Sequence, residues 1–254
     1  MTVAIGGVVL GPGRPRVCVP LTGATVEVLE AEARAIEPGV ADLIELRIDR
    51  LAALDDPAAV RGAIGAVRAA LHPGLPILLT CRTAAEGGGA HLAPQDLRDL
   101  LLRSLREQVD AVDVEMALPA AVVTDVVDAA HAAGTPVVLS FHDLRGTPSR
   151  EEVVERLVRQ QAQGADVVKL ACTPATADDV LTLLGATLDY TARPDARPAV
   201  TMAMGPLGVV SRLAGETFGS VLTFGTVGAA SAPGQVDAGA LRGVLDLLHG
   251  AQTR

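Results

Sequence analysis

Short apolar runs alternate regularly with stretches of helical periodicity along this chain. Each run has the length and β-branched content of a buried strand, and an amphipathic pattern long enough for a helix follows it. Strands that alternate with helices in this way predict βαβ units and a parallel sheet. The predicted strands are residues 16–21, 42–48, 76–81, 110–115, 136–142, 165–171, 198–204 and 220–224.

The predicted helices fill the intervals between these strands. They include residues 24–36, 94–107, 118–133, 150–163, 175–188 and 237–249. Eight strands in 254 residues match a closed (β/α)8 TIM barrel, an α/β fold of typically about 250 residues. An open doubly wound sheet is the alternative, but no GxGxxG motif follows the first strand.

The ends of the chain complete the predicted architecture. Before the first strand, we expect a β-hairpin turned by Gly11-Pro12-Gly13. Proline and glycine are otherwise spread evenly, without a linker-like cluster. Residues 1–254 are therefore predicted to form a single barrel domain.

Composition excludes several classes of protein. Hydrophobic residues make up 49% of the chain and charged residues 20%, which favours a large core over disorder. The net charge of −9 comes without a basic stripe, so no nucleic-acid partner is expected. No apolar stretch reaches the roughly 18 residues that span a bilayer, and the N-terminus lacks the basic flank of a signal peptide. We expect a cytoplasmic protein with no membrane partner.

The cysteines do not indicate disulfides or metal. Cys18, Cys81 and Cys172 are odd in number and lie separately, within or beside apolar runs. Such residues are typical of buried free thiols in a reducing compartment. Neither CxxC nor HExxH occurs, and no metal site is predicted.

Pairs of same-face residues that include a charged or polar side chain mark the ends of five successive predicted strands. Because side chains alternate faces along a strand, residues i and i+2 point the same way. In a barrel, such pairs would converge at the carboxyl-terminal mouth, where active sites are built. The pairs are Glu45 with Arg47, Thr80 with Arg82, Asp113 with Glu115, Ser140 with His142, and Val167 with Lys169.

Lys169 is the one lysine in the chain, and it lies within an apolar strand. Arginine can replace lysine as a solvated charge but not as an uncharged amine. Burial and the nearby cations Arg47 and Arg82 would lower the pKa of Lys169 from about 10.4 towards about 7–8. Lys169 is thus a candidate for Schiff-base formation with a ketone. The alternative is a structural lysine paired with Glu45 or Glu115 inside the barrel.

His142 and Glu86 are candidates for proton transfer. His142 ends the strand before Lys169, and a pKa near about 6.5 suits a general acid and base beside an imine. Glu86 precedes three glycines, which are typical of a mobile loop, and its carboxylate could fix the His142 tautomer. A loop histidine and a solvated glutamate are the alternatives.

Arginines and a long loop predict the binding of a small anion. Arg47, Arg82 and Arg212 lie near predicted strand ends, and the guanidinium fork binds carboxylates bidentately. Residues 225–239 are rich in small residues and turn formers, which suits a loop that closes over a polar ligand. A flexible surface loop is the alternative.

With these residues in place, the sequence resembles type I 3-dehydroquinate dehydratase. The resemblance keeps the family's order over about 200 residues, and seven ordered segments are far more specific than any one of them. The matching segments are Glu45-Leu46-Arg47-Ile48-Asp49, Thr80-Cys81-Arg82-Thr83 with Glu86-Gly87-Gly88, Val112-Asp113-Val114-Glu115, Ser140-Phe141-His142-Asp143 with Thr147-Pro148, Asp166-Val167-Val168-Lys169-Leu170-Ala171, Met202-Ala203-Met204-Gly205 with Ser211-Arg212, and Ser231-Ala232-Pro233-Gly234-Gln235.

The resemblance implies a homodimeric barrel that converts 3-dehydroquinate to 3-dehydroshikimate in the shikimate pathway without metal or cofactor. It implies that Lys169 forms an imine with the C3 ketone of the substrate. His142 would remove a C2 proton and then protonate the departing C1 hydroxyl, and Glu86 would orient His142. An imine acts as an electron sink, so a histidine of ordinary basicity suffices.

The same resemblance assigns the binding residues. Arg212 and Ser231 are implied to grip the substrate carboxylate. The remaining binding residues position the hydroxyl groups and close the site: Glu45, Arg47, Arg82 and Gln235. Three positions depart from the family pattern, because Pro20 replaces a small hydroxyl residue and Leu46 and Leu144 stand where aromatic residues are frequent.

Two other functions fit parts of the pattern. A class I aldolase also uses a lysine imine in a barrel, but it usually binds phosphate through glycine-rich loops after strands seven and eight, which residues 204–208 and 225–228 resemble only loosely. A non-catalytic barrel that binds or regulates would not need Glu86, His142 and Lys169 together. Turnover of 3-dehydroquinate to a conjugated enone would distinguish these functions.

Overall fold

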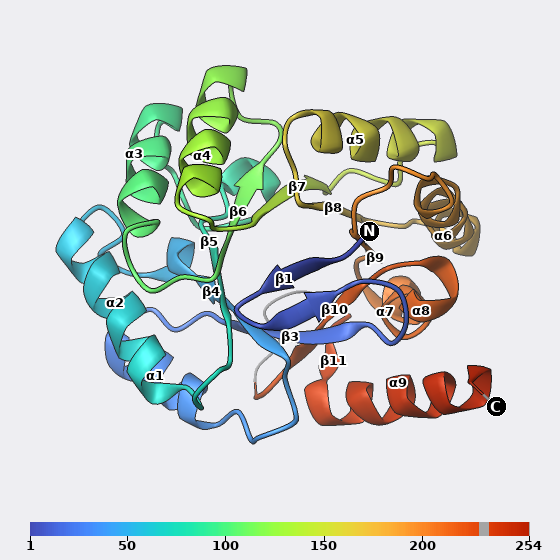
Figure 1. Ribbon diagram of the computed structural model, residues 1–254, viewed down its shortest axis with the longest axis horizontal. Helices are drawn as coiled ribbons and strands as arrows, with labels where there is room; N and C mark the ends of the chain where they lie inside the picture. Colours follow the sequence, from blue (N-terminus) through green and yellow to red (C-terminus); the bar gives the residue numbers. More distant parts are fainter. Residues whose placement is uncertain (229–233, 254) are drawn as a thin grey trace.

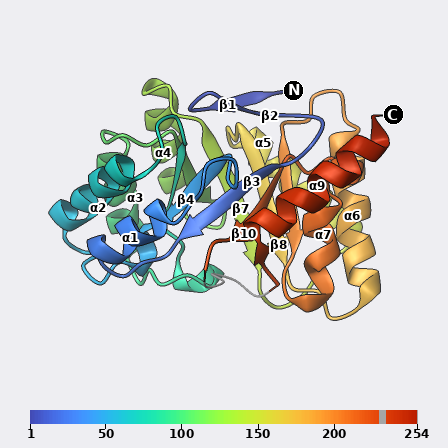
Figure 2. The same ribbon diagram turned by 90° about the horizontal axis from the view of Figure 1, so that it is seen from below.

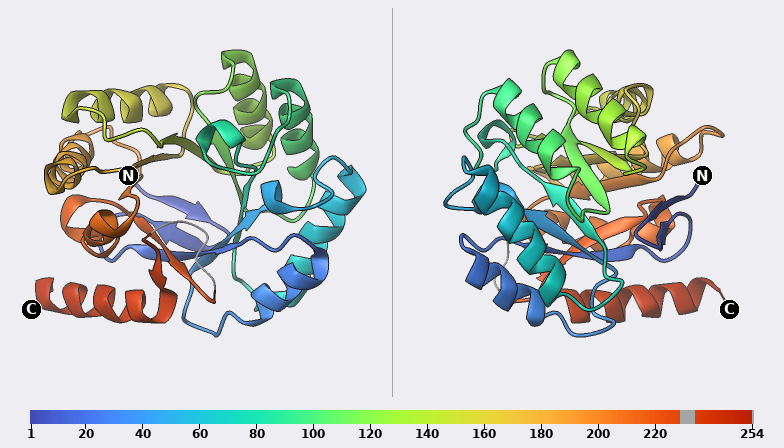
Figure 3. Two further views of the ribbon diagram at one scale, coloured as in Figure 1. Left: turned by 180° about the vertical axis from the view of Figure 1, so that it is seen from behind. Right: turned by 60° about the vertical axis from the view of Figure 1, so that its left-hand side comes forward.

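A cylinder of parallel strands forms the centre of the molecule, and helices surround it (Figures 1 and 3). The structure is a computed structural model, and it describes residues 1–228 and 234–253. Its nine-stranded sheet has the spatial order β11-β10-β3-β4-β5-β6-β7-β8-β9. The strands are β3 (Arg16–Leu21), β4 (Leu43–Arg47), β5 (Ile77–Thr80), β6 (Ala111–Glu115), β7 (Val137–Asp143), β8 (Val167–Cys172), β9 (Ala199–Ala203), β10 (Leu222–Thr226) and β11 (Val236–Asp237).

A seam between β9 and β10 closes the sheet on itself. The backbone N–H of Val221 donates to the carbonyl of Ala199 at 2.9 Å, and Ala199 and Ser220 form an isolated parallel bridge. β11 pairs instead with the last residues of β10. The predicted (β/α)8 barrel is confirmed, and the eight predicted strands correspond to β3–β10.

Helices cover the outside of the barrel. The predicted helices are present, with ends that differ by a few residues. The longer helices are α1 (Val26–Arg34), α2 (Pro57–Ala70), α3 (Pro94–Ser104), α4 (Ala120–Ala132), α5 (Arg150–Ala162), α6 (Ala177–Thr191) and α9 (Ala238–Gln252). The short ones are η1 (Ile48–Arg50), η2 (Ala84–Glu86), η3 (Pro206–Gly208), α7 (Val209–Leu213) and α8 (Gly215–Phe218).

Local signals explain where the helices begin. The hydroxyl of Ser149 caps α5 and that of Thr176 caps α6, and in each case the third helical residue, Glu152 or Asp179, accepts from the cap backbone. Such capping boxes satisfy N–H groups that the first helical turn leaves open. No helix among the described residues is long and apolar enough to cross a membrane.

The N-terminal hairpin closes the barrel at the end where the strands begin. It consists of β1 (Val3–Ile5) and β2 (Val8–Leu10) and lies over one end of the strands (Figure 2). Ile5 and Leu10 are fully buried among side chains of the barrel interior. A hairpin was predicted here, but its expected turn at Gly11–Gly13 is wrong. The chain turns at Gly6 and Gly7, whose φ values of 51° and 92° suit the left-handed positions of a tight hairpin turn.

Candidate active site

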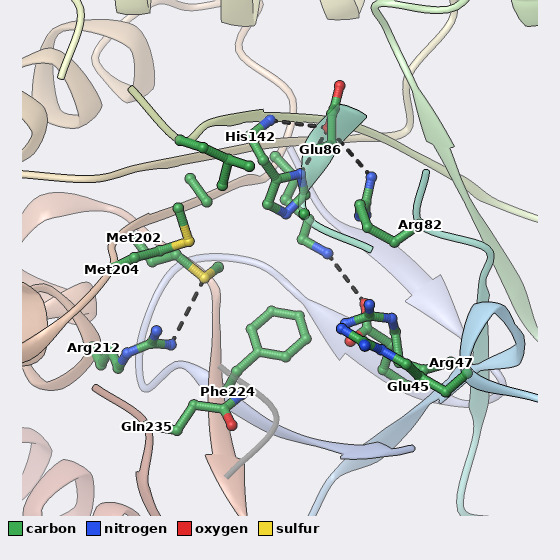
Figure 4. A pocket seen from close by; sticks show the side chains of 15 residues that line it. Glu45, Arg47, Arg82, Glu86, His142, Met202, Met204, Arg212, Phe224 and Gln235 are labelled. Carbon is green, nitrogen blue, oxygen red and sulfur yellow. Dashed lines mark hydrogen bonds and ion pairs between the residues drawn. The ribbon is translucent and has the colours of Figure 1, made fainter. Parts of the chain in front are cut away.

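Polar side chains converge at the carboxyl ends of the barrel strands, as strand alternation predicted. They line a pocket at the mouth of the barrel (Figure 4). Eight of the nine predicted site residues border it, and Ser231 lies outside the described residues. The eight are Glu45, Arg47, Arg82, Glu86, His142, Lys169, Arg212 and Gln235.

Lys169 lies in the barrel interior, held between two carboxylates. Its Nζ is 2.9 Å from Asp113 Oδ2 and 3.3 Å from Glu45 Oε1. Nζ also lies 4.8 Å from the centre of the Phe224 ring, a favourable position for a cation. The partners are thus Asp113 and Glu45; Glu115 pairs with Arg82 instead.

The expected lowering of the Lys169 pKa is wrong for this arrangement. Burial does lower the pKa of Lys169, and it is the largest single influence. Asp113 and Glu45 act in the opposite direction, and together they leave the pKa above its usual value. An opposite charge within hydrogen-bond distance favours the charged form of a buried group. The resting side chain is therefore an ammonium.

The Lys169 backbone is held by a side chain from outside the barrel. Gln160 of α5 is fully buried. Its Nε2 donates to the Lys169 carbonyl at 2.9 Å, and its Oε1 accepts from the Lys169 N–H at 3.0 Å. One amide thus satisfies both backbone groups of the residue that carries the amine, a contact that the sequence analysis missed.

Arg82 borders the pocket and lies within a network of acids. Its guanidinium donates to Asp113 at 2.7 Å, to Glu115 at 3.0 Å and to Ser140 Oγ at 2.9 Å. Burial lowers the pKa of Arg82, but the surrounding carboxylates outweigh burial and raise it. In turn, the cation of Arg82 helps to keep the pKa of Asp113 low although burial opposes this. The Arg82 guanidinium therefore bonds to these acids and also borders the pocket.

His142 and Glu86 form a buried pair at the pocket wall. Glu86 Oε2 accepts the backbone N–H of His142 at 3.0 Å and lies 2.8 Å from its Nδ1 (Figure 4). Burial raises the pKa of Glu86 to about 8, against the lowering influence of Arg82. Burial, Arg82 and Lys169 lower the pKa of His142 well below its usual value. His142 is therefore neutral in the resting site.

The glycine run after Glu86 forms a closely packed turn. Gly87 ends η2 with a φ of 83°, and Gly89 N–H donates to Asp49 Oδ2 at 2.9 Å. A Cβ at Gly88 would lie 2.0 Å from the carbonyl oxygen of Arg82. Glycine is required here because the backbone passes so close, and the turn fixes the Glu86 side chain.

Two further arginines lie around the pocket. Arg47 forms two hydrogen bonds of 2.8 Å with Asp49, which hold its guanidinium at the end of β4. Arg212, on α7, is almost fully buried, and burial lowers its pKa to about 10. One of its nitrogens lies 3.8 Å from the sulfur of Met202. A buried cation facing the pocket suits an anionic group of a ligand.

Most of the apolar wall of the pocket and one charge at its rim were not predicted from the sequence. The apolar residues are Leu144, Met202, Met204 and Phe224, which come from β9, β10 and the ends of neighbouring strands. Arg50, in η1, adds a partly exposed cation. Apolar strand residues carry no signal that separates a pocket wall from the core, so only the spatial arrangement identifies them.

Together these groups provide an amine, a neutral histidine paired with a carboxyl group, and several cations around an apolar wall. An amine can form an imine with a ketone, and the histidine can move a proton beside it. The cations can hold an anionic substrate. The arrangement therefore suits elimination from a small, negatively charged ketone.

Known proteins are similar to this chain in sequence and fold. A sequence model of the type I 3-dehydroquinase family matches residues 17–252. The chain is 44% identical over 250 residues to the 3-dehydroquinate dehydratase of Listeria monocytogenes serotype 4a (strain HCC23), with 97% of this chain and 98% of that relative covered. It is 41% identical over 247 residues to the 3-dehydroquinate dehydratase of Klebsiella pneumoniae subsp. pneumoniae, with the same coverage.

Solved structures of 3-dehydroquinate dehydratases are also similar to this chain in fold. The type I 3-dehydroquinate dehydratase of Clostridium difficile, with covalent modified comenic acid, has a TM-score of 0.94 and 37% sequence identity over 99% of this chain and 98% of that chain. The 3-dehydroquinate dehydratase of Geobacillus kaustophilus also has a TM-score of 0.94, with 33% identity over 100% of this chain and 98% of that chain.

Proposed function

The chain belongs to the type I 3-dehydroquinase family and catalyses the dehydration of 3-dehydroquinate, and we propose that it does so through an imine on Lys169. The observation that carries the proposal is the convergence of the one lysine of the chain with the His142–Glu86 pair in a single pocket. Each group has the chemistry that one step of the dehydration requires.

The first step forms the imine. The Lys169 ammonium gives one proton to neutral His142, and the free amine adds to the C3 carbonyl of the substrate. A proton moves from nitrogen to oxygen within the adduct, and His142 returns its proton to the new hydroxyl. That hydroxyl leaves as water, and the product of the step is an iminium that joins Lys169 to C3.

The second step is the elimination. Neutral His142 removes a proton from C2, and the electron pair moves into the iminium to give an enamine. The enamine then donates its electron pair back through C2, so that a C1–C2 double bond and the iminium form as the C1–O bond breaks. His142 gives its proton to the departing hydroxyl, which leaves as water. Hydrolysis of the iminium consumes one water, frees the ketone and restores Lys169. The cycle removes one water from the substrate overall and requires no cofactor or metal.

The remaining polar groups position the substrate in this proposal. Arg212 binds the carboxylate with Ser231, because a buried guanidinium gains most from an anionic partner. Glu45 and Gln235 bind hydroxyl groups of the substrate, and Arg47 and Arg82 help to position these groups and to close the site. Since Arg82 already bonds to three buried groups, we propose that it mainly fixes the acids around Lys169.

The assembly and location of the protein belong to the same proposal. We propose a homodimer of single-domain chains that works in the cytoplasm on the shikimate pathway. The aldolase and the non-catalytic barrel are set aside, because relatives above 40% identity across almost the whole chain are dehydratases.

Borohydride trapping tests the imine directly. We expect protein treated with 3-dehydroquinate and sodium borohydride to gain the mass of one reduced adduct, on the peptide that contains Lys169. Lys169→Arg should give no adduct and no turnover while it keeps the fold, since a guanidinium cannot form the imine. Turnover by wild-type protein without any trapped adduct would contradict the mechanism but not the family assignment.

A further inference from the structure

Asp113 occupies a position that the proposed mechanism has not yet used. Its side chain is almost fully buried in the middle of β6, and it is not among the residues that line the pocket. Oδ2 lies 2.9 Å from Lys169 Nζ, a shorter distance than the 3.3 Å from Nζ to Glu45. Because Asp113 does not line the pocket, a ligand that fills the pocket need not displace this carboxylate from the reacting nitrogen.

The other oxygen of Asp113 is held by separate donors. Oδ1 accepts a hydrogen bond of 2.6 Å from Ser140 Oγ and one of 2.7 Å from Arg82. These bonds leave Oδ2 directed at the amine. A buried carboxylate bonded on both oxygens is fixed in place and ionised, because hydrogen bonds to the charged form favour it.

Glu45 is less suited to the same task. Its Oε1 is shared between Lys169 Nζ and the hydroxyl of Thr80, which donates at 3.0 Å. Glu45 also borders the pocket, where it is available to a substrate hydroxyl. The two carboxylates therefore divide the work, with one facing the ligand and one facing the nitrogen.

We propose that Asp113 is the counterion of the iminium that Lys169 forms, with Ser140 and Arg82 holding it in position. The inference rests on the proposed imine. The ammonium carries one positive charge at Nζ, and the iminium carries the same charge at the same atom. A fixed carboxylate stabilises both, and it keeps the imine protonated, which is the form that accepts the electron pair from C2.

The charge on the Lys169 nitrogen changes during the elimination, whereas the charge on Asp113 stays the same. When His142 removes the C2 proton, the nitrogen becomes neutral, and when the C1–O bond breaks, the positive charge returns. Asp113 lowers the energy of the charged species on both sides of the enamine. Other charged or titratable groups face the same space, namely Glu45, Glu115, Arg47, Arg82 and the neutral His142, and each of them is retained when Asp113 alone is changed.

The single lysine allows a direct measurement. Protein labelled with carbon-13 at lysine Cε gives one side-chain signal, and its chemical shift against pH reports the pKa of Lys169. We expect Asp113→Asn to lower the midpoint by at least about one pH unit, a tenfold change in the protonation equilibrium. Ser140→Ala keeps the carboxylate and removes one supporting bond, so its midpoint should move less. An Asp113→Asn midpoint equal to that of the wild type would overturn the inference.

Turnover supplies the second measurement. We expect Asp113→Asn to reduce kcat by about 100-fold, comparable to the loss of one group that stabilises charge in an active site. Asp113→Glu, which keeps the charge, should recover part of the loss. Unchanged kcat in folded Asp113→Asn protein would overturn the proposal, as would equal losses in the Asn and Glu variants.

Two controls separate the possible failures. Circular dichroism and thermal unfolding establish that each variant folds. If Asp113→Asn does not fold, the decision passes to Ser140→Ala, and a Lys169 midpoint and a kcat both equal to those of the wild type would then overturn the inference. Wild-type protein that cannot be trapped by borohydride contradicts the imine itself, whereas a trapped wild type with an unshifted Asp113→Asn midpoint contradicts only the counterion.

Discussion

At the scale of single residues, burial affects the acids and bases of the pocket differently according to their neighbours. Glu86 keeps its proton to about pH 8 because its nearest favourable charge, Arg82, only partly offsets burial. Asp113 is equally enclosed, but its pKa is lowered because two cations and a hydroxyl contact it. The identity of a residue therefore does not determine its charge here; its contacts do.

We expect Glu86→Gln to change the dependence of stability on pH. The Glu86 carboxyl loses its proton near pH 4.5 in the unfolded chain and at about pH 8 in the folded protein. Between these values the folded state binds more protons, so its contribution to stability is complete below 4.5 and is lost as pH rises towards 8. The loss is on the order of 1.4 kcal/mol per pH unit within this window.

Urea unfolding at a series of pH values measures this effect. The wild type should lose stability relative to Glu86→Gln as pH rises through the window. Glu37→Gln, which removes an exposed carboxylate, is the matched control and should run parallel to the wild type. Parallel curves for the wild type and Glu86→Gln would show that the Glu86 pKa is not raised.

At the scale of elements, the contact between α5 and β8 connects the outside of the barrel to its chemistry. Gln160 extends from the helix to both backbone groups of Lys169. Helix and strand each follow from hydrophobic periodicity, but that pattern does not predict a polar side chain between them. The bond keeps the strand that carries the amine at a fixed distance from its covering helix.

Gln160→Leu should destabilise the protein and lower kcat. Leucine is close in size but leaves two buried backbone groups without the amide, at about 1–3 kcal/mol for each unsatisfied group. Gln161→Leu is the control, since Gln161 lies on the same helix but bonds to Tyr190 and Asp195. We expect both variants to lose stability in urea unfolding and only Gln160→Leu to lose kcat. Equal kcat in the two variants would contradict a role for Gln160 in holding Lys169.

The elements themselves could largely be predicted from the sequence. Strand positions and the convergence of polar strand ends followed from apolar periodicity and from the alternation of side chains. The position of the hairpin turn did not, because Gly6-Gly7 and Gly11-Pro12-Gly13 are both turn signals, and only burial of Ile5 and Leu10 decides between them. The Lys169 pKa was also mispredicted, since its direction depends on which of several charges lies closest.

At the scale of the whole molecule, the two ends of the barrel have different tasks. The hairpin closes the end where the strands begin, and the pocket opens at the end where they finish. Hydrophobic packing dominates the first end and charge dominates the second. A substitution in the hairpin should therefore affect mainly the stability of the protein, and a substitution in the pocket should affect mainly its kinetics.

Ile5→Ala tests this separation. The side chain is fully buried, so its truncation should cost about 2–5 kcal/mol of unfolding free energy. Measured well below its unfolding temperature, the variant should keep the kcat and KM of the wild type. Val9→Ala, on the exposed side of the same hairpin, should change neither stability nor kinetics. A large fall in kcat for folded Ile5→Ala would show that the two ends are coupled.

The seam between β9 and β10 is the part of the barrel wall where we expect local opening to occur most readily. Where the other neighbouring strands share ladders, this pair meets at Ala199 and Val221, and β11 takes the place of β9 beside the end of β10. Local opening follows the lines of fewest hydrogen bonds. Amide hydrogens along the seam should therefore exchange with deuterium before those of β6 to β8. Lys169 on β8 and Asp113 on β6 should exchange slowly, so that opening of the seam would leave the amine beside its carboxylate.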